Sequence, residues 1–145
     1  MASRDEADDR RLITAVLYRY ATALDSQRWE LLDEVFTADA HLDFSSAGSI
    51  EGLYPEVRAW LETHMSRFRR LQHFVTNVRV ELAADRARAQ SYVHAVHGWK
   101  DDRGFHLAEL GGEYRDRFVA TDAGWRIQKR VLVHHWSRGD RPPDV

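Results

Sequence analysis

The feature that most limits the possible folds is a run of four long β-type segments in the second half of the chain. They are rich in β-branched and aromatic residues and span Leu71–Leu82, Arg88–Trp99, Phe105–Val119 and Trp125–Trp136. Short stretches with turn chemistry, such as Asp101-Asp102-Arg103-Gly104, separate them. Connections this short join antiparallel neighbours. The pattern therefore predicts an antiparallel meander.

The first half of the chain predicts three helices and a short strand. Asp8–Leu24 carries apolar residues at helical spacing. Ser26 is expected to cap a second helix, whose apolar face runs from Trp29 to Phe36. Ala40–Ser45 alternates as a strand does, and Pro55 suits the first turn of a third helix. Helices followed by a meander indicate an α+β fold.

Both faces of the predicted sheet carry apolar residues. A sheet with one wet face would alternate more cleanly, so we expect helices on one face and a second copy of the chain on the other. Gly111-Gly112, in the middle of a segment, suggests a bulge or sharp bend. We therefore expect a cone-shaped barrel, in which a strongly bent antiparallel sheet wraps around three N-terminal helices and encloses a pocket. A homodimer or higher homo-oligomer would form through the sheet.

Composition narrows the class of protein. A length of 145 residues predicts a single domain over residues 1–145, with a flexible tail at 139–145. The absence of cysteine excludes disulfides, thiolate metal sites and cysteine nucleophiles. A formal net charge of −2 argues against a nucleic-acid partner. No apolar run suits a membrane span and the N-terminus lacks a signal peptide, so we expect a cytoplasmic protein without a membrane partner.

The eight histidines raise the question of a metal site. His94 and His97 are three apart in a predicted strand, so they point to opposite faces. His134 and His135 diverge for the same reason. Because these pairs are dispersed, we expect no metal site.

Four other polar residues fall where a core or pocket is expected, namely Tyr20, Asp25, His73 and Arg130. A buried charge must be paired, and Asp25 can orient His73 so that its second ring nitrogen acts as a base. Arg130 would hold an anionic oxygen or leaving group, and Tyr20 would donate to a carbonyl or hydroxyl. The alternative is that all four are ordinary core groups. Tyr20 would then bind a backbone carbonyl, Asp25 would cap the second helix, and Arg130 would form a structural ion pair.

Several short motifs follow one another along residues 10–136, each occurring once. They are Arg19-Tyr20-Ala-Thr-Ala-Leu-Asp25-Ser-Gln-Arg-Trp29-Glu, Phe36-Thr-Ala-Asp39-Ala40, Leu71-Gln-His73-Phe-Val-Thr-Asn77, Gly111-Gly112-Glu-Tyr114 and Gly124-Trp125-Arg-Ile127. In this order the motifs resemble the SnoaL-like family of the nuclear transport factor 2-like superfamily. The resemblance implies a cone-shaped α+β barrel with a deep pocket, usually dimeric.

Within that family the chain is most similar to the branch of scytalone dehydratase, bile-acid 7α-dehydratase and hexachlorocyclohexane dehydrochlorinase. Their aspartate falls on Asp25 and their base histidine on His73. The bile-acid enzyme's tyrosine falls on Tyr20, the dehydrochlorinase's arginine falls on Arg130, and the bile-acid enzyme's arginine lies near His134. These enzymes use no metal or organic cofactor. The aspartate base of ketosteroid isomerases falls near Asp43, but one residue out of step, which turns it to the other face.

The resemblance therefore implies a cofactor-independent lyase of the dehydratase type, with the Asp25–His73 pair as base and a mostly apolar, cyclic small molecule as substrate. Residues expected to line the pocket are Phe44, Tyr54, Trp60, His64, Leu132 and His134. Two alternatives stay open. One is a non-catalytic domain that binds a ligand or assembles with an oxygenase, as the small subunits of ring-hydroxylating dioxygenases do. The other is an isomerase or polyketide cyclase that uses the same pair.

Overall fold

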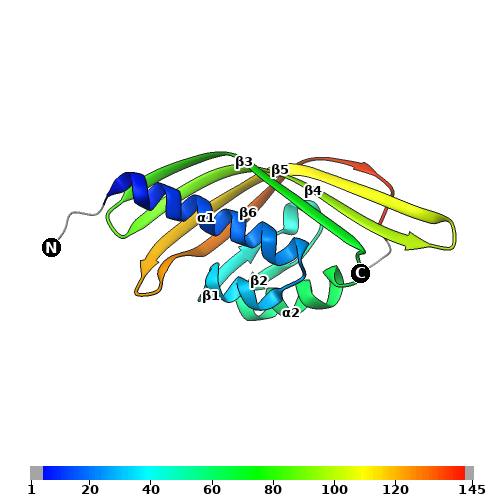
Figure 1. Ribbon diagram of the computed structural model, residues 1–145, viewed down its shortest axis with the longest axis horizontal. Coiled ribbons are helices and arrows are strands. Elements are labelled where there is room, and N and C mark those ends of the chain that lie inside the picture. Colours follow the sequence, from blue (N-terminus) through cyan, green and yellow to red (C-terminus); the bar gives the residue numbers. More distant parts are fainter. Residues whose placement is uncertain (1–4, 143–145) are drawn as a thin grey trace.

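The computed structural model describes residues 5–142 (Figure 1). The first half contains helix α1 (Glu6–Asp25), the 3₁₀ helix η1 (Trp29–Glu34), strand β1 (Phe36–Asp43), the 3₁₀ turn η2 (Ser45–Ala47), strand β2 (Glu51–Leu53) and helix α2 (Tyr54–Met65). The second half contains strands β3 (Arg70–Ala83), β4 (Arg86–Asp101), β5 (Gly104–Thr121) and β6 (Gly124–Gly139). The predicted β-segments are confirmed, each somewhat longer than expected.

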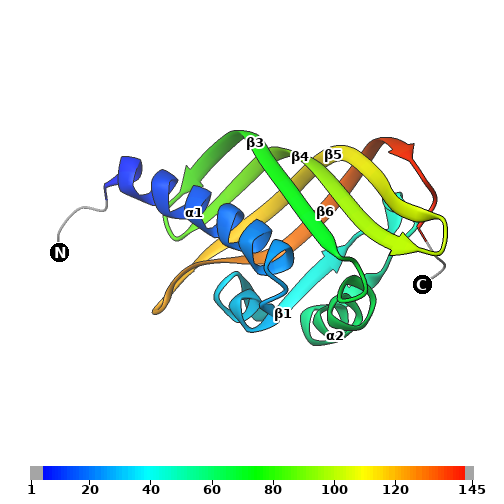
Figure 2. The ribbon, with the colours of Figure 1, turned by 45° about the vertical axis from the view of Figure 1, so that its right-hand side comes forward.

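The described strands form one six-stranded sheet in the order β2-β1-β6-β5-β4-β3. Strands β3 to β6 are successive antiparallel neighbours, which confirms the meander. Strand β1 pairs parallel with β6 and antiparallel with β2, so the sheet is mixed. The sheet arches over α1 and α2, which lie on its concave side (Figures 1 and 2). The α+β fold is confirmed, although the barrel is not closed, because β2 and β3 remain as edges.

The junction after α1 differs from the sequence prediction. Ser26 does not cap a second helix; it ends α1, and its hydroxyl donates to the carbonyl of Thr22. Gln27 follows with φ of 54°, a left-handed conformation that ends the helix. The backbone amide of Arg28 then donates a hydrogen bond to the carbonyl of Ala23 at 2.9 Å. The second helix then begins at Trp29 as a 3₁₀ helix with no side-chain cap.

The first strand also begins earlier than predicted, at Phe36 instead of Ala40. Phe36 pairs with Ile127 of β6, and a register shift separates this contact from the pairing of His41 with Lys129. Pairing with a strand distant in sequence overrides the local helical pattern here, because it buries Phe36 in the core.

The bend predicted at Gly111-Gly112 is confirmed. The register between β5 and β6 shifts between these two glycines, so the sheet bends there. A Cβ atom at Gly111 would overlap the indole of Trp136, which lies across the strand. Glycine therefore lets β6 fold over β5, and this bend helps to shape the concave side where the helices pack.

Candidate active site

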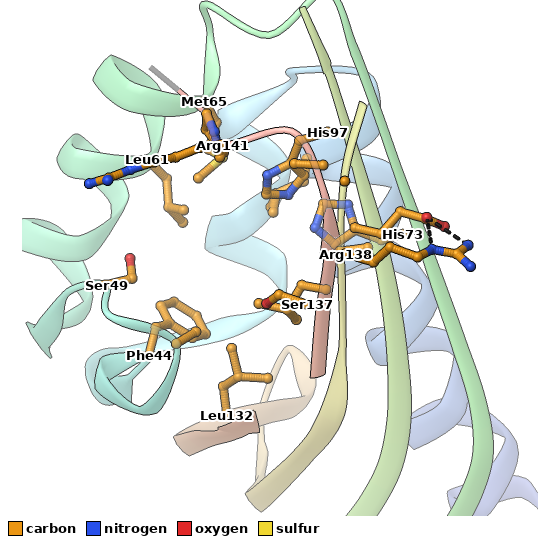
Figure 3. A pocket seen from close by; sticks show the side chains of 18 of the residues that line it. Phe44, Ser49, Leu61, Met65, His73, His97, Leu132, Ser137, Arg138 and Arg141 are labelled. Atoms are coloured by element: carbon orange, nitrogen blue, oxygen red, sulfur yellow. Dashed lines mark hydrogen bonds and ion pairs between the residues drawn. The ribbon is translucent and has the colours of Figure 1, made fainter. Parts of the chain in front are cut away.

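A cavity of about 480 Å³ lies on the concave side of the sheet, between the sheet, α1, α2 and the C-terminal segment (Figure 3). Apolar side chains supply much of its wall, among them Leu24, Phe44, Leu61, Met65, Leu110 and Leu132. Polar side chains also line it, chiefly Tyr20, His73, His97, Tyr114 and Ser137, and so do the charged residues Glu109, Arg138, Asp140 and Arg141. A cavity of this size that combines an apolar wall with polar groups is typical of a small-molecule site.

Asp25 and His73 form the pair that the sequence predicts. The Nδ1 atom of His73 lies 2.7 Å from Oδ1 of Asp25, and the backbone amide of His73 donates to Oδ2 at 3.1 Å. The His73 side chain is 5% exposed and projects into the cavity (Figure 3). With Nδ1 donating to the carboxylate, Nε2 keeps its lone pair and is the nitrogen available to a ligand.

The helix and the strand that carry this pair hold it in place. Asp25 is the last residue of α1, where the negative end of the helix dipole disfavours a carboxylate. No basic residue lies in the last turn of α1 to offset this charge. The two donors of His73, near the start of β3, satisfy the carboxylate instead. The position of Asp25 is thus stabilised only when α1 packs against β3.

His97 is a second cavity histidine that sequence reasoning missed. Its ring centroid lies 5.8 Å from that of His73, on the adjacent strand β4. Burial, together with nearby His73, lowers the pKa of His97 to about 4, so the ring is neutral at neutral pH. Strand parity separates His94 from His97, and the buried residues Val93 and Ala95 of β4 share the parity of His97. This alternation was the sequence signal that could have placed His97 on the buried face of β4.

Tyr20 lines the cavity, and its ring centroid lies 6.3 Å from that of His73. Arg130 does not line the cavity, contrary to expectation. It is fully buried and donates through Nε and Nη2 to the two carboxylate oxygens of Asp116, at 2.8 and 2.9 Å. Asp116 lies directly opposite on β5, and the rings of Tyr20 and Tyr114 lie against the guanidinium. This arrangement matches the alternative of a structural ion pair.

Of the residues expected to line the pocket, Phe44, Trp60 and Leu132 do so. Tyr54 does not, because its hydroxyl turns away and donates to Asp33 at 2.7 Å. His64 stacks on Trp60 with ring centroids 4.3 Å apart, outside the cavity lining.

His134 also lies outside the cavity lining, and its Nε2 is 2.7 Å from the hydroxyl of Ser137. Ser137, which follows the irregularity in the β5–β6 pairing, lines the cavity instead. Asp43 is absent from the cavity lining, as its parity predicts, and accepts from the amide of Ser45 at 2.9 Å.

The C-terminal segment bounds one side of the cavity. Strand β6 runs to Gly139, so the expected loose tail begins inside a strand, and residues 143–145 lie outside the described part of the chain. The amide of Asp140 donates to Leu107 at 2.8 Å, and its carboxylate lies 2.9 Å from Nδ1 of His106. Arg141 and Pro142 complete this wall (Figure 3).

Two further findings concern residues 5–142 alone. Within this range no group of three or more histidine, aspartate or glutamate side chains is arranged to hold a metal ion. No helix in the same range combines the length and apolar character that a membrane span requires.

Proteins of similar sequence and similar fold are known. An uncharacterized protein of Mycobacterium tuberculosis is 35% identical over 131 residues, covering 90% of this chain and 88% of that protein. A Kribbella flavida protein of known structure is 26% identical with a TM-score of 0.86, covering 92% and 95% of the two chains.

Two less similar structures share the fold. A candidate scytalone dehydratase of Novosphingobium aromaticivorans is 23% identical with a TM-score of 0.79, covering 92% of this chain and 88% of that one. A hexachlorocyclohexane dehydrochlorinase of Novosphingobium barchaimii is 18% identical with a TM-score of 0.77, covering 94% and 97%. At these identities the likeness shows the fold alone.

A family model for the SnoaL-like domain matches residues 5–131 of this chain. The order of helices, the curved sheet and the motifs that suggested the resemblance all lie within this range. The chain therefore belongs to the SnoaL-like family.

Proposed function

We propose that this protein is a cofactor-independent lyase that removes water or another small leaving group from an apolar, cyclic substrate. The observation that carries the proposal is the Asp25–His73 pair, joined at 2.7 Å, beside a cavity of about 480 Å³. A general base must lie within hydrogen-bond reach of the proton it takes, and the free Nε2 of His73 meets a ligand in this cavity.

In the proposed reaction, His73 takes a proton from the substrate and becomes an imidazolium. The carboxylate of Asp25 stabilises that charge through Nδ1 and prevents the ring from turning. His97, which is neutral at neutral pH, adds no second positive charge beside the imidazolium. His73 then returns the proton to the departing group, which leaves as water when that group is a hydroxyl.

The cavity supports the proposed class of substrate. Phe44, Leu61 and Leu132 offer an apolar wall opposite the side that carries His73 and His97 (Figure 3). A volume of about 480 Å³ suits a ligand of a few fused rings. The names of the similar structures, a candidate scytalone dehydratase and a hexachlorocyclohexane dehydrochlorinase, describe eliminations from cyclic molecules and support the same class.

The experiment uses a panel of cyclic 3-hydroxyketones fused to apolar rings, with dehydration followed by the ultraviolet absorption of the conjugated product. We expect turnover of at least one compound, and a fall of roughly 10²–10⁴ in rate for His73→Gln. The matched control is His41→Gln, which changes an exposed histidine paired with Glu51 outside the cavity lining.

Full turnover by His73→Gln would exclude this mechanism. Saturable binding without turnover across the panel would favour the ligand-binding alternative, and a product that keeps its hydroxyl but moves a double bond would favour the isomerase.

We also propose that two copies associate through the convex face of the sheet. Phe74, Tyr92 and Trp136 are 44%, 52% and 42% exposed there. The ring of His94 lies between two of them, with centroids 5.6 Å from Phe74 and 5.4 Å from Trp136. Exposed aromatic residues gathered on one face are typical of an interface.

A further inference from the structure

Like charges lie directly opposite one another across three strands of the sheet. Arg88 of β4 pairs with Arg117 of β5, and Arg117 pairs in turn with Lys129 of β6. Residues in such positions share a face of the sheet, with Cβ atoms about 4.5–5.5 Å apart, and like charges there destabilise the pairing. All three side chains are exposed, and in β4 and β5 they alternate with core residues such as Ala87 and Phe118, so they project from the convex face.

Among residues 5–142 these three cations have no partner that would offset the repulsion. Another arginine of the same face shows the contrast, since Arg115 donates to the carboxylate of Glu113 at 2.6 Å. No ion pair or hydrogen bond holds the side chain of Arg88, Arg117 or Lys129 to another of the described residues. The row is therefore a cost to the fold that contacts within this part of the chain do not repay.

Two of these cations line a hollow in the surface together with a further arginine. The hollow has a volume of about 510 Å³, and Arg86, Arg88 and Arg117 all line it. Arg86 and Arg88 lie two residues apart on β4, so they share a face with Cα atoms about 7 Å apart. Between their strands lie Ala87 and Phe118, whose side chains belong to the core, so backbone forms the floor of the hollow.

The charges around the hollow favour an anion. Gln128, which lies where the β5–β6 register shifts, accepts from Nη1 of Arg86 at 3.2 Å and so helps to fix this guanidinium beside the hollow. Among the described residues that line the hollow, Glu81 alone is acidic. It lies directly opposite Arg88 but forms no ion pair with it. Three arginines against one carboxylate leave a net positive charge.

We propose that Arg86, Arg88 and Arg117 form a binding site for a phosphate group on the convex face of the sheet. A guanidinium presents its donors in a planar fork that matches the oxygens of phosphate. A phosphate group carries a charge of about −1.5 to −2 near neutral pH and three acceptor oxygens, so it can bridge three arginines, which the two oxygens of a carboxylate cannot. The bound anion supplies the partner that the row lacks.

This site is separate from the other sites proposed for the molecule. The cavity that holds His73 lies on the concave side of the sheet. The exposed aromatic residues proposed as the contact between copies surround His94, which lies six residues beyond Arg88 on β4. That separation is about 20 Å in an extended strand. Phosphate binding therefore stands or falls independently of the elimination and of the dimer.

The test titrates inorganic phosphate and phenyl phosphate into the protein by isothermal titration calorimetry. An ionic strength of about 0.15 M screens exposed charges more than about 8 Å from the ligand, so that binding reports the local groups. We expect saturable binding of one phosphate group per chain. Tighter binding of phenyl phosphate would identify a phosphate carried by an organic molecule, and equal or weaker binding would identify the free ion.

Arg88→Gln and Arg117→Gln should each weaken phosphate binding by about tenfold or more, because each removes hydrogen bonds between charged groups. The matched control is Arg79→Gln, at an exposed arginine of β3 that donates to Gln90 at 2.8 Å outside the lining of the hollow. This variant should bind phosphate nearly as the parent does.

Thermal unfolding supplies a second measurement. Phosphate, compared with chloride at the same ionic strength, should raise the Tm of the parent protein but not that of Arg117→Gln, because a ligand stabilises only a fold that binds it. The proposal is overturned if the parent shows no saturable phosphate binding. It is also overturned if Arg79→Gln weakens binding as much as Arg117→Gln does, since the overall charge of the face would then account for the binding.

Discussion

At the scale of single residues, the proposed chemistry depends on the contact between Asp25 and His73. The carboxylate receives both the ring Nδ1–H and the backbone amide of His73. Asp25→Asn keeps the shape of the side chain but removes the charge that fixes the tautomer. We expect a loss of roughly 10³–10⁴ in turnover number with a small change in the Michaelis constant, measured on any substrate found in the hydroxyketone panel. Retention of the parent turnover number would show that the carboxylate is not needed.

His97 gives a second prediction at this scale, concerning stability against pH. Its folded pKa of about 4 lies below its ordinary value of 6.5, so the fold favours the neutral ring. As the pH falls from 6.5 towards 4, His97 binds a proton in the unfolded chain but stays neutral in the folded chain. The free energy of unfolding therefore decreases over this range. The shift corresponds to about 3 kcal/mol.

His97→Gln should therefore flatten the fall in the free energy of unfolding over this pH range, as measured by urea denaturation at several pH values. His41→Gln, at an exposed histidine, serves as the control. An unchanged slope in His97→Gln would contradict the assignment.

At the scale of elements, the end of β6 is tied to the β4–β5 hairpin through His106. This ring lies 2.9 Å from the carboxylate of Asp140 and 2.8 Å from that of Asp101, and it stacks on Trp99. Both ring nitrogens can donate only when the ring is protonated. The two carboxylates raise the pKa of His106 above 6.5. The contact is therefore complete at acidic pH and is lost as the pH rises through the raised pKa.

We expect hydrogen exchange at the amide of Asp140, corrected for intrinsic rates, to accelerate as the pH rises above 6.5. That amide donates to the carbonyl of Leu107, so its exchange reports opening of this wall of the cavity. His106→Gln should remove the pH-dependent part. Equal pH dependence in the variant and the parent would show that His106 does not hold the segment.

The bend in β5 gives a further prediction at this scale. A Cβ atom at Gly111 would overlap the indole of Trp136, and only a shift of β6 or of that ring relieves the overlap. Gly111→Ala should lower the free energy of unfolding by about 1–3 kcal/mol, measured by chemical denaturation. Gly48→Ala is a useful comparison, because Gly48 has open space around its Cα but a φ of 74°, so any loss there comes from backbone strain alone.

At the scale of the whole molecule, the convex face of the sheet stays open in the single chain. We expect a dimer in light scattering coupled to size-exclusion chromatography, and expect Phe74→Glu with Tyr92→Glu to shift it to the monomer, because charges buried without partners disfavour the interface. The matched control is Leu53→Glu, at a residue of β2 that is 56% exposed, on the edge of the sheet opposite the β3 strand that carries Phe74. A monomeric parent protein would refute this association.

The sequence alone carries much of the fold because its signals are local. Alternation and turn chemistry predict β3 to β6, and the pair Gly111-Gly112 predicts the bend, since each signal depends on neighbouring residues. The Asp25–His73 contact was predictable for a related reason. A charge expected in the core needs a partner, and the motif resemblance named the same pair.

Only the tertiary structure decided which partners the other polar side chains of the site contact. Arg130 satisfies Asp116 because β5 and β6 place the two directly opposite, a register that no local pattern specifies. The same register brings Tyr114 beside Tyr20, and the β3–β4 pairing brings His97 beside His73. The sheet also stays open, because closure depends on whether its edge strands meet. The sequence by itself thus determined most of the elements and the contact between Asp25 and His73, whereas the contacts between strands decided what surrounds that pair, since the energy of a buried charge depends on the groups packed against it.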